Sequence, residues 1–216
     1  MKTVAYRTSE LEPPAIYRLL TGLVLPRPIA FVSTLSTDGV ANLAPFSFFT
    51  VASADPPVLA ISIDLRYGHQ VKDTLRNIAN NGEFVVNIAT GDLAKSVNTA
   101  SLDWEPGIDE FAKAGLTAVR DNLVVKPPRV GESPAQFECR HLQSVEFGKW
   151  TLVLGAVLAI RFREDMVDAR MRVDVGALRP LGRLQGNDYC RVTERFTVER
   201  DADSPGIMVP GAQSRG

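Results

Sequence analysis

The stretch from Asn42 to Phe49, with Pro45 inside an apolar segment, is the feature that most constrains how this chain can fold. It follows an extended run, 29–35, and a turn signal at Asp38-Gly39. The run is apolar at most positions on both faces, so we expect a strand covered on two sides. Proline has no N–H to donate, so a strand that contains it must lie at a sheet edge, carry a bulge or end there. A backbone that leaves its ladder here could direct free amide groups at a flat polar heterocycle. The alternative is an ordinary hydrophobic strand-to-loop transition.

The rest of the chain reads as short strands with few helices. The patterns predict strands at 29–35, 58–63, 83–89, 123–125, 137–142, 144–147, 150–162 and 191–198. They predict helices that begin at 13, 74, 92 and 109, each with an apolar face. Asp73 or Thr74 can cap the second helix and Asn81-Gly82 can end it, and Asp92 caps the third. We therefore expect one domain over residues 1–200, mainly β with helical insertions in an antiparallel barrel, followed by a flexible tail, 201–216.

The segment after the strand 58–63 carries a second cluster of polar residues. Ser62 stands near the end of that strand, and Arg66, Lys72 and Thr74 precede or open the next helix. A helix N-terminus with cations and hydroxyl groups is a site for a phosphate monoester. The alternative is a capped helix with solvated charges, since every helix needs a cap.

Composition excludes several classes of function. The formal net charge is -1 over 216 residues, which gives no reason to expect a nucleic acid or an anionic membrane as partner. Two cysteines and two histidines, without metal-ligand spacing, argue against a metal site and favour free thiols in the cytoplasm. The sequence has no Rossmann glycine motif and no nucleophile turn. We take the acidic pairs Asp109-Glu110 and Glu164-Asp165 to be solvated, and expect the chemistry to belong to a bound organic cofactor.

Taken together, many segments resemble the flavin reductase-like family, whose fold is an FMN-binding split barrel and whose members include flavoredoxin-type proteins. The resemblance covers roughly residues 13–198. It rests on Pro26-Arg27-Pro28 to Thr34, Asn42 to Phe49, Lys72-Asp73-Thr74, Phe84 to Ile88, Asp109-Glu110-Phe111, Pro127 to Val130, Glu138-Cys139, Gly155-x-Val157 and Pro180 to Leu184 with Tyr189.

The resemblance implies a set of flavin-binding residues. The isoalloxazine ring would be bordered by Ser33, Thr34 and Asn42 and by the backbone of Ala44, Pro45, Phe46 and Ser47. The ribityl phosphate would be held by Ser62, Arg66, Lys72 and Thr74. Family members are homodimers with the flavin near the interface, so Trp104 or Tyr189 could come from the partner subunit or could serve in core packing.

The implied activity is hydride transfer from NADH or NADPH to FMN, with the reduced flavin released, in some cases to a monooxygenase, or used on another acceptor. Two alternatives stay open: a flavoredoxin-like electron carrier, and a flavoenzyme that acts directly on a small organic substrate. One departure bears on the choice. Many relatives carry histidines after Gly155-x-Val157, where this chain has Ala159 and Arg161. Arg161 could contact a nucleotide phosphate or be a surface strand residue.

Overall fold

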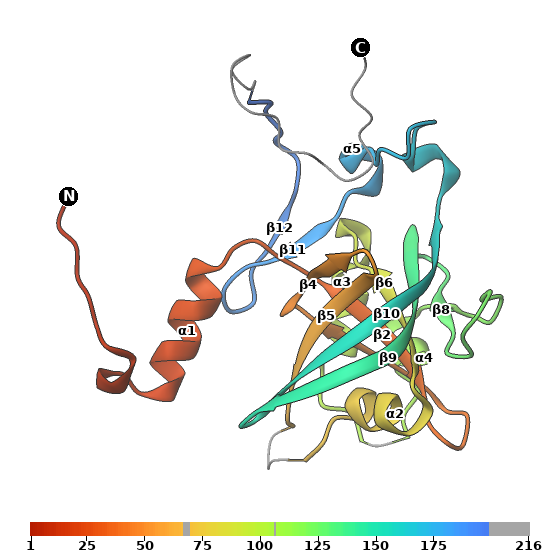
Figure 1. The fold of residues 1–216 in the computed structure, drawn as a ribbon, viewed down its shortest axis with the longest axis horizontal. Coiled ribbons are helices and arrows are strands. Elements are labelled where there is room, and N and C mark those ends of the chain that lie inside the picture. The colour runs from red at the N-terminus through yellow and green to blue at the C-terminus, as the bar shows by residue number, and fades with distance from the viewer. Residues whose placement is uncertain (67–69, 106, 199–216) are drawn as a thin grey trace.

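The structure is a computed structural model that describes residues 1–66, 70–105 and 107–198 (Figure 1). The predicted tail, 201–216, lies outside these residues, and the division into one domain and a tail stays a prediction. The helices are α1 (Pro13–Leu23), α2 (Asp73–Asn81), α3 (Ala94–Ala100), α4 (Glu110–Ala114) and α5 (Val175–Leu178), with short 3-10 turns at Thr8–Glu10, Gly91–Leu93 and Glu164–Met166. None of the helices in the described part of the chain has the length and apolar character that crossing a membrane requires.

A seven-stranded antiparallel sheet forms the body of the molecule, in the order β3-β2-β6-β9-β10-β5-β4. Its strands are β2 (Ala30–Leu35), β3 (Ala41–Phe46), β4 (Phe49–Ala54), β5 (Pro57–Asp64), β6 (Glu83–Ile88), β9 (Ala135–Phe147) and β10 (Trp150–Phe162). β3 and β4 stand at opposite ends of this order, yet only Ser47 and Phe48 separate them in the chain. The three Cα–Cα steps from Phe46 to Phe49 span at most about 10 Å, so the sheet must curl until its two edges meet. The mainly β, barrel-like fold expected from the sequence is confirmed.

The described residues also form two smaller sheets. β1 (Arg27–Pro28), β11 (Leu181–Arg183) and β12 (Tyr189–Arg191) form one, and β7 (Ala118–Val119) with β8 (Arg129–Val130) forms the other. The first sheet brings residues from the two ends of the chain together, because Arg27 pairs with Arg183. These strands have two or three residues each, and the sequence patterns did not predict them.

The strand β2 is apolar on both faces because each face is covered. Phe31 packs into a core with Leu43 and the helices α3 and α4, whereas Ala30 and Val32 pack into a second core with Phe84. Inside this second core β10 has no side chain at Gly155, since a Cβ there would lie 2.3 Å from the ring of Phe84. The expected two-sided burial of the strand is confirmed.

The predicted strand 123–125 is wrong, for a physical reason. Its backbone N–H groups donate to one buried carboxylate, that of Glu138, at 2.6–3.1 Å, rather than to a neighbouring strand. The predicted strand 191–198 is also wrong: β12 ends at Arg191, and residues 192–198 form no regular structure. The predicted strands 137–142 and 144–147 are one continuous strand, β9, which pairs with β10 across a turn at Gly148-Lys149.

The helix caps differ in detail from the prediction. Lys72, rather than Asp73 or Thr74, precedes the first residue of α2 at the N-cap, and no side chain bonds to the free N–H groups there. Asp92 lies within a 3-10 turn and forms an ion pair with Arg179.

Figure 1 shows α1 projecting from the barrel, and its Leu20 and Leu23 are exposed. The predicted apolar face of α1 is therefore left exposed by the described part of the chain.

Candidate functional site

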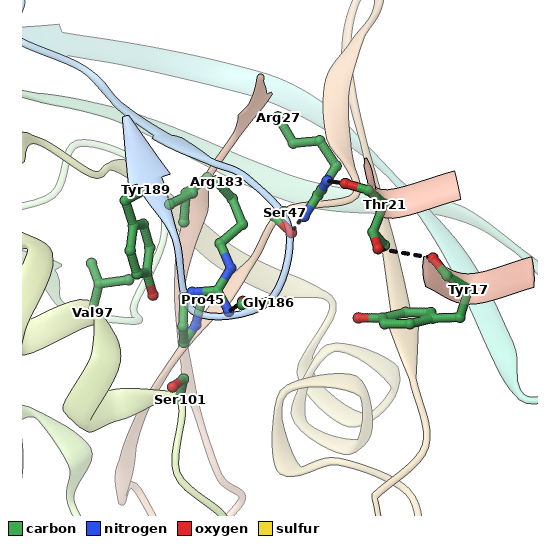
Figure 2. Close-up of a pocket in the computed structure, with 11 residues that line it drawn as sticks. Tyr17, Thr21, Arg27, Pro45, Ser47, Val97, Ser101, Arg183, Gly186 and Tyr189 are labelled. Atoms are coloured by element: carbon green, nitrogen blue, oxygen red, sulfur yellow. Dashed lines mark hydrogen bonds between the residues drawn. The ribbon is translucent and has the colours of Figure 1, made fainter. Parts of the chain in front are cut away.

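Two cavities meet beside β3 and share Pro45 and Ser101 as common wall residues. We call the first the arginine cavity; it has a volume of about 210 Å³ (Figure 2). Its walls come from α1, β1, β3, α3 and β11, and from Gly186 and Tyr189, which follow β11 in the chain. We call the second the helix cavity; it has a volume of about 70 Å³ and lies at the N-terminus of α2. Together they approach the lower end of the size range of small-molecule sites, which begins at about 300 Å³.

The edge position of β3 explains the proline. β3 pairs only with β2, and the N–H of Leu43 points away from that partner to the carboxylate of Glu110, at 3.1 Å. Residues two apart on a strand present the same edge, so the nitrogen of Pro45 also faces outward, where it costs no ladder bond. The strand continues through Pro45 and ends at Phe46, directly before a bend at Ser47 and Phe48, so the expected edge position of the proline is confirmed and a strand end does fall within this stretch. Pro45 therefore lies on the open edge of the sheet, at the wall between the two cavities.

Most of the predicted flavin-binding residues meet at these cavities. The helix cavity is lined by Asn42, Ala44, Pro45, Phe46, Arg66, Lys72 and Thr74, and Ser47 lines the arginine cavity. Thr34 lies behind this surface, fully buried, where its hydroxyl oxygen accepts from the side-chain amides of Asn42 at 3.2 Å and Asn77 at 3.0 Å. The amide of Asn42 also donates to Thr74 at 3.0 Å. This network fixes Asn42 against α2.

Two predicted residues stand elsewhere. Ser33 is fully buried and donates its hydroxyl to the carbonyl of Pro128 at 2.5 Å. Ser62 lies on β5 opposite Leu152, and its backbone N–H donates to Phe48. Neither residue lines the arginine cavity or the helix cavity.

The cations of the helix cavity are already paired with carboxylates. Arg66 lies 3.1 Å from Asp73 and 3.8 Å from Asp103, and Lys72 forms an ion pair with Asp64. An anion that enters this cavity must compete for these partners. The first turn of α2 supplies further donors, because among the described residues no side chain caps its N–H groups. The positive end of the helix dipole favours a negative group at the same point.

Glu110 is a wall residue of the helix cavity that the sequence reasoning took for a solvated carboxylate. It is 5% exposed, so that expectation is wrong for this member of the acidic pair. Burial raises the pKa of Glu110 to about 7, and the nearby charges of Asp73 and Asp109 add to the rise, against the bond from Leu43 N–H. Asp109 caps α4 by accepting from Phe111 N–H at 2.9 Å, which places the next side chain against β3. The sequence contained one signal for the position of Glu110: it directly follows Asp109, a residue type that caps helices, so the carboxylate had to lie on the first turn of α4.

The arginine cavity has two guanidinium groups in its wall, and the sequence reasoning assigned a role to neither. Arg27 is 8% exposed and donates to the carbonyls of Thr21 at 2.5 Å and Leu184 at 2.9 Å, and to the hydroxyl of Ser47 at 3.4 Å. The guanidinium of Arg183 lies 4.4 Å from the centre of the Tyr189 ring. Both arginines belong to motifs of the resemblance, Pro26-Arg27-Pro28 and Pro180 to Leu184, which was the only sequence signal for them.

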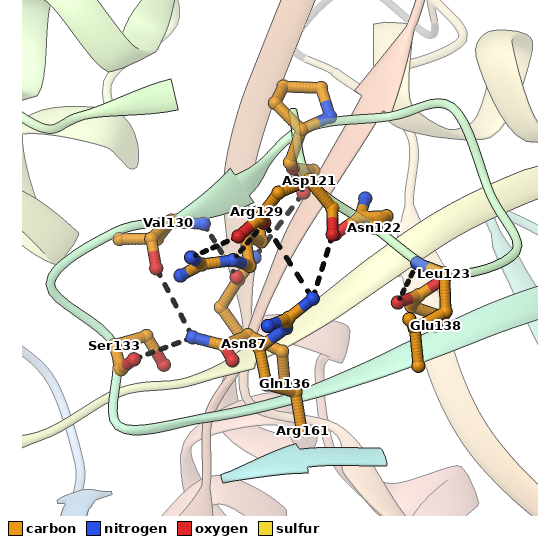
Figure 3. Close-up of polar contacts among 12 residues, drawn as sticks. Asn87, Asp121, Asn122, Leu123, Arg129, Val130, Ser133, Gln136, Glu138 and Arg161 are labelled. Atoms are coloured by element: carbon orange, nitrogen blue, oxygen red, sulfur yellow. Dashed lines mark hydrogen bonds and ion pairs between the residues drawn. The ribbon is translucent and has the colours of Figure 1, made fainter. Parts of the chain in front are cut away.

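The three residues whose roles were left open now have positions. Tyr189 lines the arginine cavity of its own chain. Trp104 donates its ring N–H to the carbonyl of Thr99 at 3.1 Å and lines neither cavity. Arg161 donates to the backbone carbonyl of Asp121 at 2.8 Å, within a polar cluster that includes the Asp121–Arg129 ion pair (Figure 3). These contacts favour the surface-strand interpretation of Arg161. The described residues bring together no group of three or more potential metal ligands.

Comparison with known proteins gives a consistent result. Residues 22–182 match the family model described as a flavin reductase like domain. The crystal structure of nitrilotriacetate monooxygenase component B from Bacillus cereus is 30% identical, with a TM-score of 0.87, over 92% of this chain and 100% of that one. The 2-nitrobenzoate 2-nitroreductase of Pseudomonas fluorescens is 32% identical, with a TM-score of 0.84, over 94% and 99%.

The split barrel is confirmed by a third structure, a putative flavin reductase with a split barrel domain from Shewanella frigidimarina. It has a TM-score of 0.77 at 17% identity, over 89% of this chain and 96% of that one, a likeness that concerns the fold alone. The family model covers well over half of the chain and all the strands of the barrel. The chain belongs to the flavin reductase like family.

Proposed function

We propose that the chain is an FMN-binding oxidoreductase that accepts hydride from NADH or NADPH. The observation that carries the proposal is the pair of adjoining cavities along the open edge of β3, one at an uncapped helix N-terminus and one beside an aromatic ring. A molecule with a phosphate at one end and a flat ring at the other matches this division. FMN has that form, and the family membership supports it.

In this proposal the helix cavity holds the phosphate. The first-turn N–H groups of α2 and the hydroxyl of Thr74 donate to its oxygens, while Lys72 and Arg66 exchange their carboxylate partners for it. Thr34 acts from behind by fixing Asn42. Ser33 and Ser62 line neither cavity and take no part in the proposed site.

The arginine cavity would take the ring, with Pro45 and Ser47 in its wall, while Ala44 and Phe46 border it from the side of the helix cavity. Bound flavin supplies the redox chemistry by accepting a hydride, and the protein supplies position and electrostatics. Donors that are fixed before reaction stabilise charge as it develops, and each can contribute about 3 kcal/mol. Alignment of a stacked nicotinamide adds the proximity contribution. No side-chain acid or base is needed for this transfer.

The test of the phosphate assignment is an FMN titration of Lys72→Ala and Thr74→Ala, followed by flavin fluorescence. Each substitution removes one charge-assisted or hydroxyl donor, so we expect FMN affinity to fall about tenfold. Lys126→Ala, an exposed lysine outside both cavities, is the matched control. Wild-type affinity in both test variants would refute the site. A stopped-flow record of flavin bleaching with NADH and with NADPH then tests hydride transfer, and no bleaching with either would refute it.

A second candidate is direct reduction of a small organic substrate. It is favoured by the near full-length similarity to a 2-nitrobenzoate 2-nitroreductase, whereas the similarity to a monooxygenase component B favours delivery of reduced flavin to a partner enzyme. Turnover of nitroaromatic acids by protein-bound flavin, with no free flavin added, distinguishes the two.

We further propose a homodimer in which a second subunit covers the exposed Leu20 and Leu23 of α1, to be checked by sedimentation velocity. Two free cysteines are consistent with action in the cytoplasm.

A further inference from the structure

Arg27 is a buried cation without an acidic partner. Arginine is almost never fully buried unless it is paired. The guanidinium of Arg27 is held instead by neutral acceptors, the carbonyls of Thr21, Val24 and Leu184 and the hydroxyl of Ser47. Among the described residues no carboxylate lies within ion-pair distance of it. These bonds fix the position of the group and leave its positive charge uncompensated.

Arg183 adds a second uncompensated cation to the same wall. It lies over the ring of Tyr189 and donates to the carbonyl of Gly186, and in the described part of the chain it too has no carboxylate partner. Arg183 stands opposite Arg27 in the pairing of β1 with β11. Burial lowers the pKa of Arg27, Tyr17 opposes this lowering, and the positive charge of Arg183 adds to it. None of the described residues that line the arginine cavity is an aspartate or a glutamate. The helix cavity differs, because its cations are paired.

Ser47 connects Arg27 to the cavity. Its hydroxyl oxygen accepts from the Nε–H of Arg27, as Figure 2 shows, so its own O–H remains available to donate. A hydroxyl that accepts from a cation is a stronger donor toward an anion. Two cations and a polarised hydroxyl therefore face one small cavity.

We infer that the arginine cavity binds the anionic, two-electron-reduced flavin ring more tightly than the neutral oxidised ring, so that the protein keeps its reduced flavin and an acceptor must come to it. The inference rests on the proposed function. In the step concerned, the C–H bond of the dihydronicotinamide breaks and an N–H bond forms on the flavin. The hydride carries both electrons, so FMN and NAD(P)H give the FMNH⁻ ring anion and NAD(P)⁺. Positive charge near the ring favours the product anion over the neutral reactant and opposes uptake of a further proton.

The inference predicts a measurable ratio of affinities. Tighter binding of the reduced form raises the reduction potential of bound FMN above that of free FMN by the same free energy, since the two equilibria form one cycle. Loss of one partly screened charge should lower the affinity ratio on the order of tenfold, which corresponds to about 30 mV for a two-electron couple. Arg183 is the position to change because it is half-buried, whereas Arg27 is buried and joins the backbone of α1, at Thr21, to Leu184, the residue directly after β11.

The experiment measures the dissociation constants of oxidised and dithionite-reduced FMN under anaerobic conditions, together with the potential of the bound flavin. Wild-type protein should bind the reduced form more tightly. In Arg183→Gln the ratio of the two dissociation constants should be about tenfold smaller than in the wild type. Arg183→Lys, which keeps the charge, should retain the wild-type ratio. Arg179→Gln, which removes an exposed arginine outside both cavities, is the control and should match the wild type.

The outcomes separate the inference from the function on which it rests. Equal affinity for the two forms in the wild type overturns the inference, as does an unchanged ratio in a folded Arg183→Gln. Both results leave FMN binding and hydride transfer intact. Absence of FMN binding to the wild type overturns the proposed function and the inference together. If Arg183→Gln does not fold, the wild-type affinity ratio alone decides.

Discussion

Replacing Glu110 by glutamine should remove a specific loss of stability at alkaline pH. Glu110 is buried, and the backbone N–H groups of Leu43 and of Glu110 itself only partly offset the cost of burying its charged form. Its pKa of about 7 in the folded chain lies above the ordinary value of 4.5. The folded state therefore holds the proton more firmly than the unfolded state. This contribution to stability is fully present below pH 4.5 and is lost as pH rises through 7.

The size of the effect follows from the shift. The rise from 4.5 to about 7 corresponds to at most about 3 kcal/mol, because one pKa unit is worth about 1.4 kcal/mol. Solvent at the open mouth of the helix cavity screens the charge, so we expect a net effect of about 2 kcal/mol. Glutamine keeps an acceptor oxygen for Leu43 and carries no charge at any pH. For a chain of this size, about 2 kcal/mol moves the melting temperature by about 4–8 °C.

Thermal or urea unfolding at pH 5 and at pH 8.5 measures this difference. Glu110→Gln should be close to the wild type at pH 5 and about 2 kcal/mol more stable than it at pH 8.5. Glu146→Gln, which neutralises an exposed carboxylate on β9, should follow the wild type at both values. An equal fall in stability between the two pH values in Glu110→Gln and the wild type would show that this carboxylate is not the buried titrating group. Stronger FMN binding by the variant at pH 8.5 would further support an anion site in the helix cavity.

Three other predictions concern the core. Gly155→Ala places a methyl group against Phe84 and should cost about 1–3 kcal/mol of unfolding free energy, with recovery in the double variant that also carries Phe84→Leu; no recovery would contradict the packing argument. Glu138→Gln loses at least one bond to the N–H groups of segment 123–125 and should cost about 2 kcal/mol, measured by urea unfolding, with faster amide exchange in that segment. Burial raises the pKa of Cys139 to about 12, so its thiol should resist alkylation at pH 8 until the chain unfolds, and rapid labelling of the native protein would refute its burial.

The parts of the fold that the sequence predicted are those decided by neighbouring residues. The run 29–35 indicated burial on both faces, and the two cores on either side of β2 confirm it. Gly82 ends α2 with a left-handed backbone, as the Asn81-Gly82 pair predicted. The segment 123–125 misled because it has the composition of a strand, while its hydrogen bonds go to a carboxylate 13 to 15 residues later. A local pattern contains no information about such a partner.

In the candidate site too, the sequence predicted contacts between residues that are close along the chain and missed contacts between residues that are far apart along it. Arg66, Lys72 and Thr74 lie close together in the sequence around one helix start, and the structure brings all three to one cavity. The arginine cavity instead depends on a contact between Arg27 and the backbone of Leu184, 157 residues apart. Arginine is usually exposed, so the residue type alone predicts solvation. What makes Arg27 a functional candidate is the set of neutral acceptors around it, and that set exists only after β1 pairs with β11. The charge of the cavity is therefore a property of the assembled fold, and substitutions that break the β1–β11 pairing should alter flavin affinity without touching either arginine.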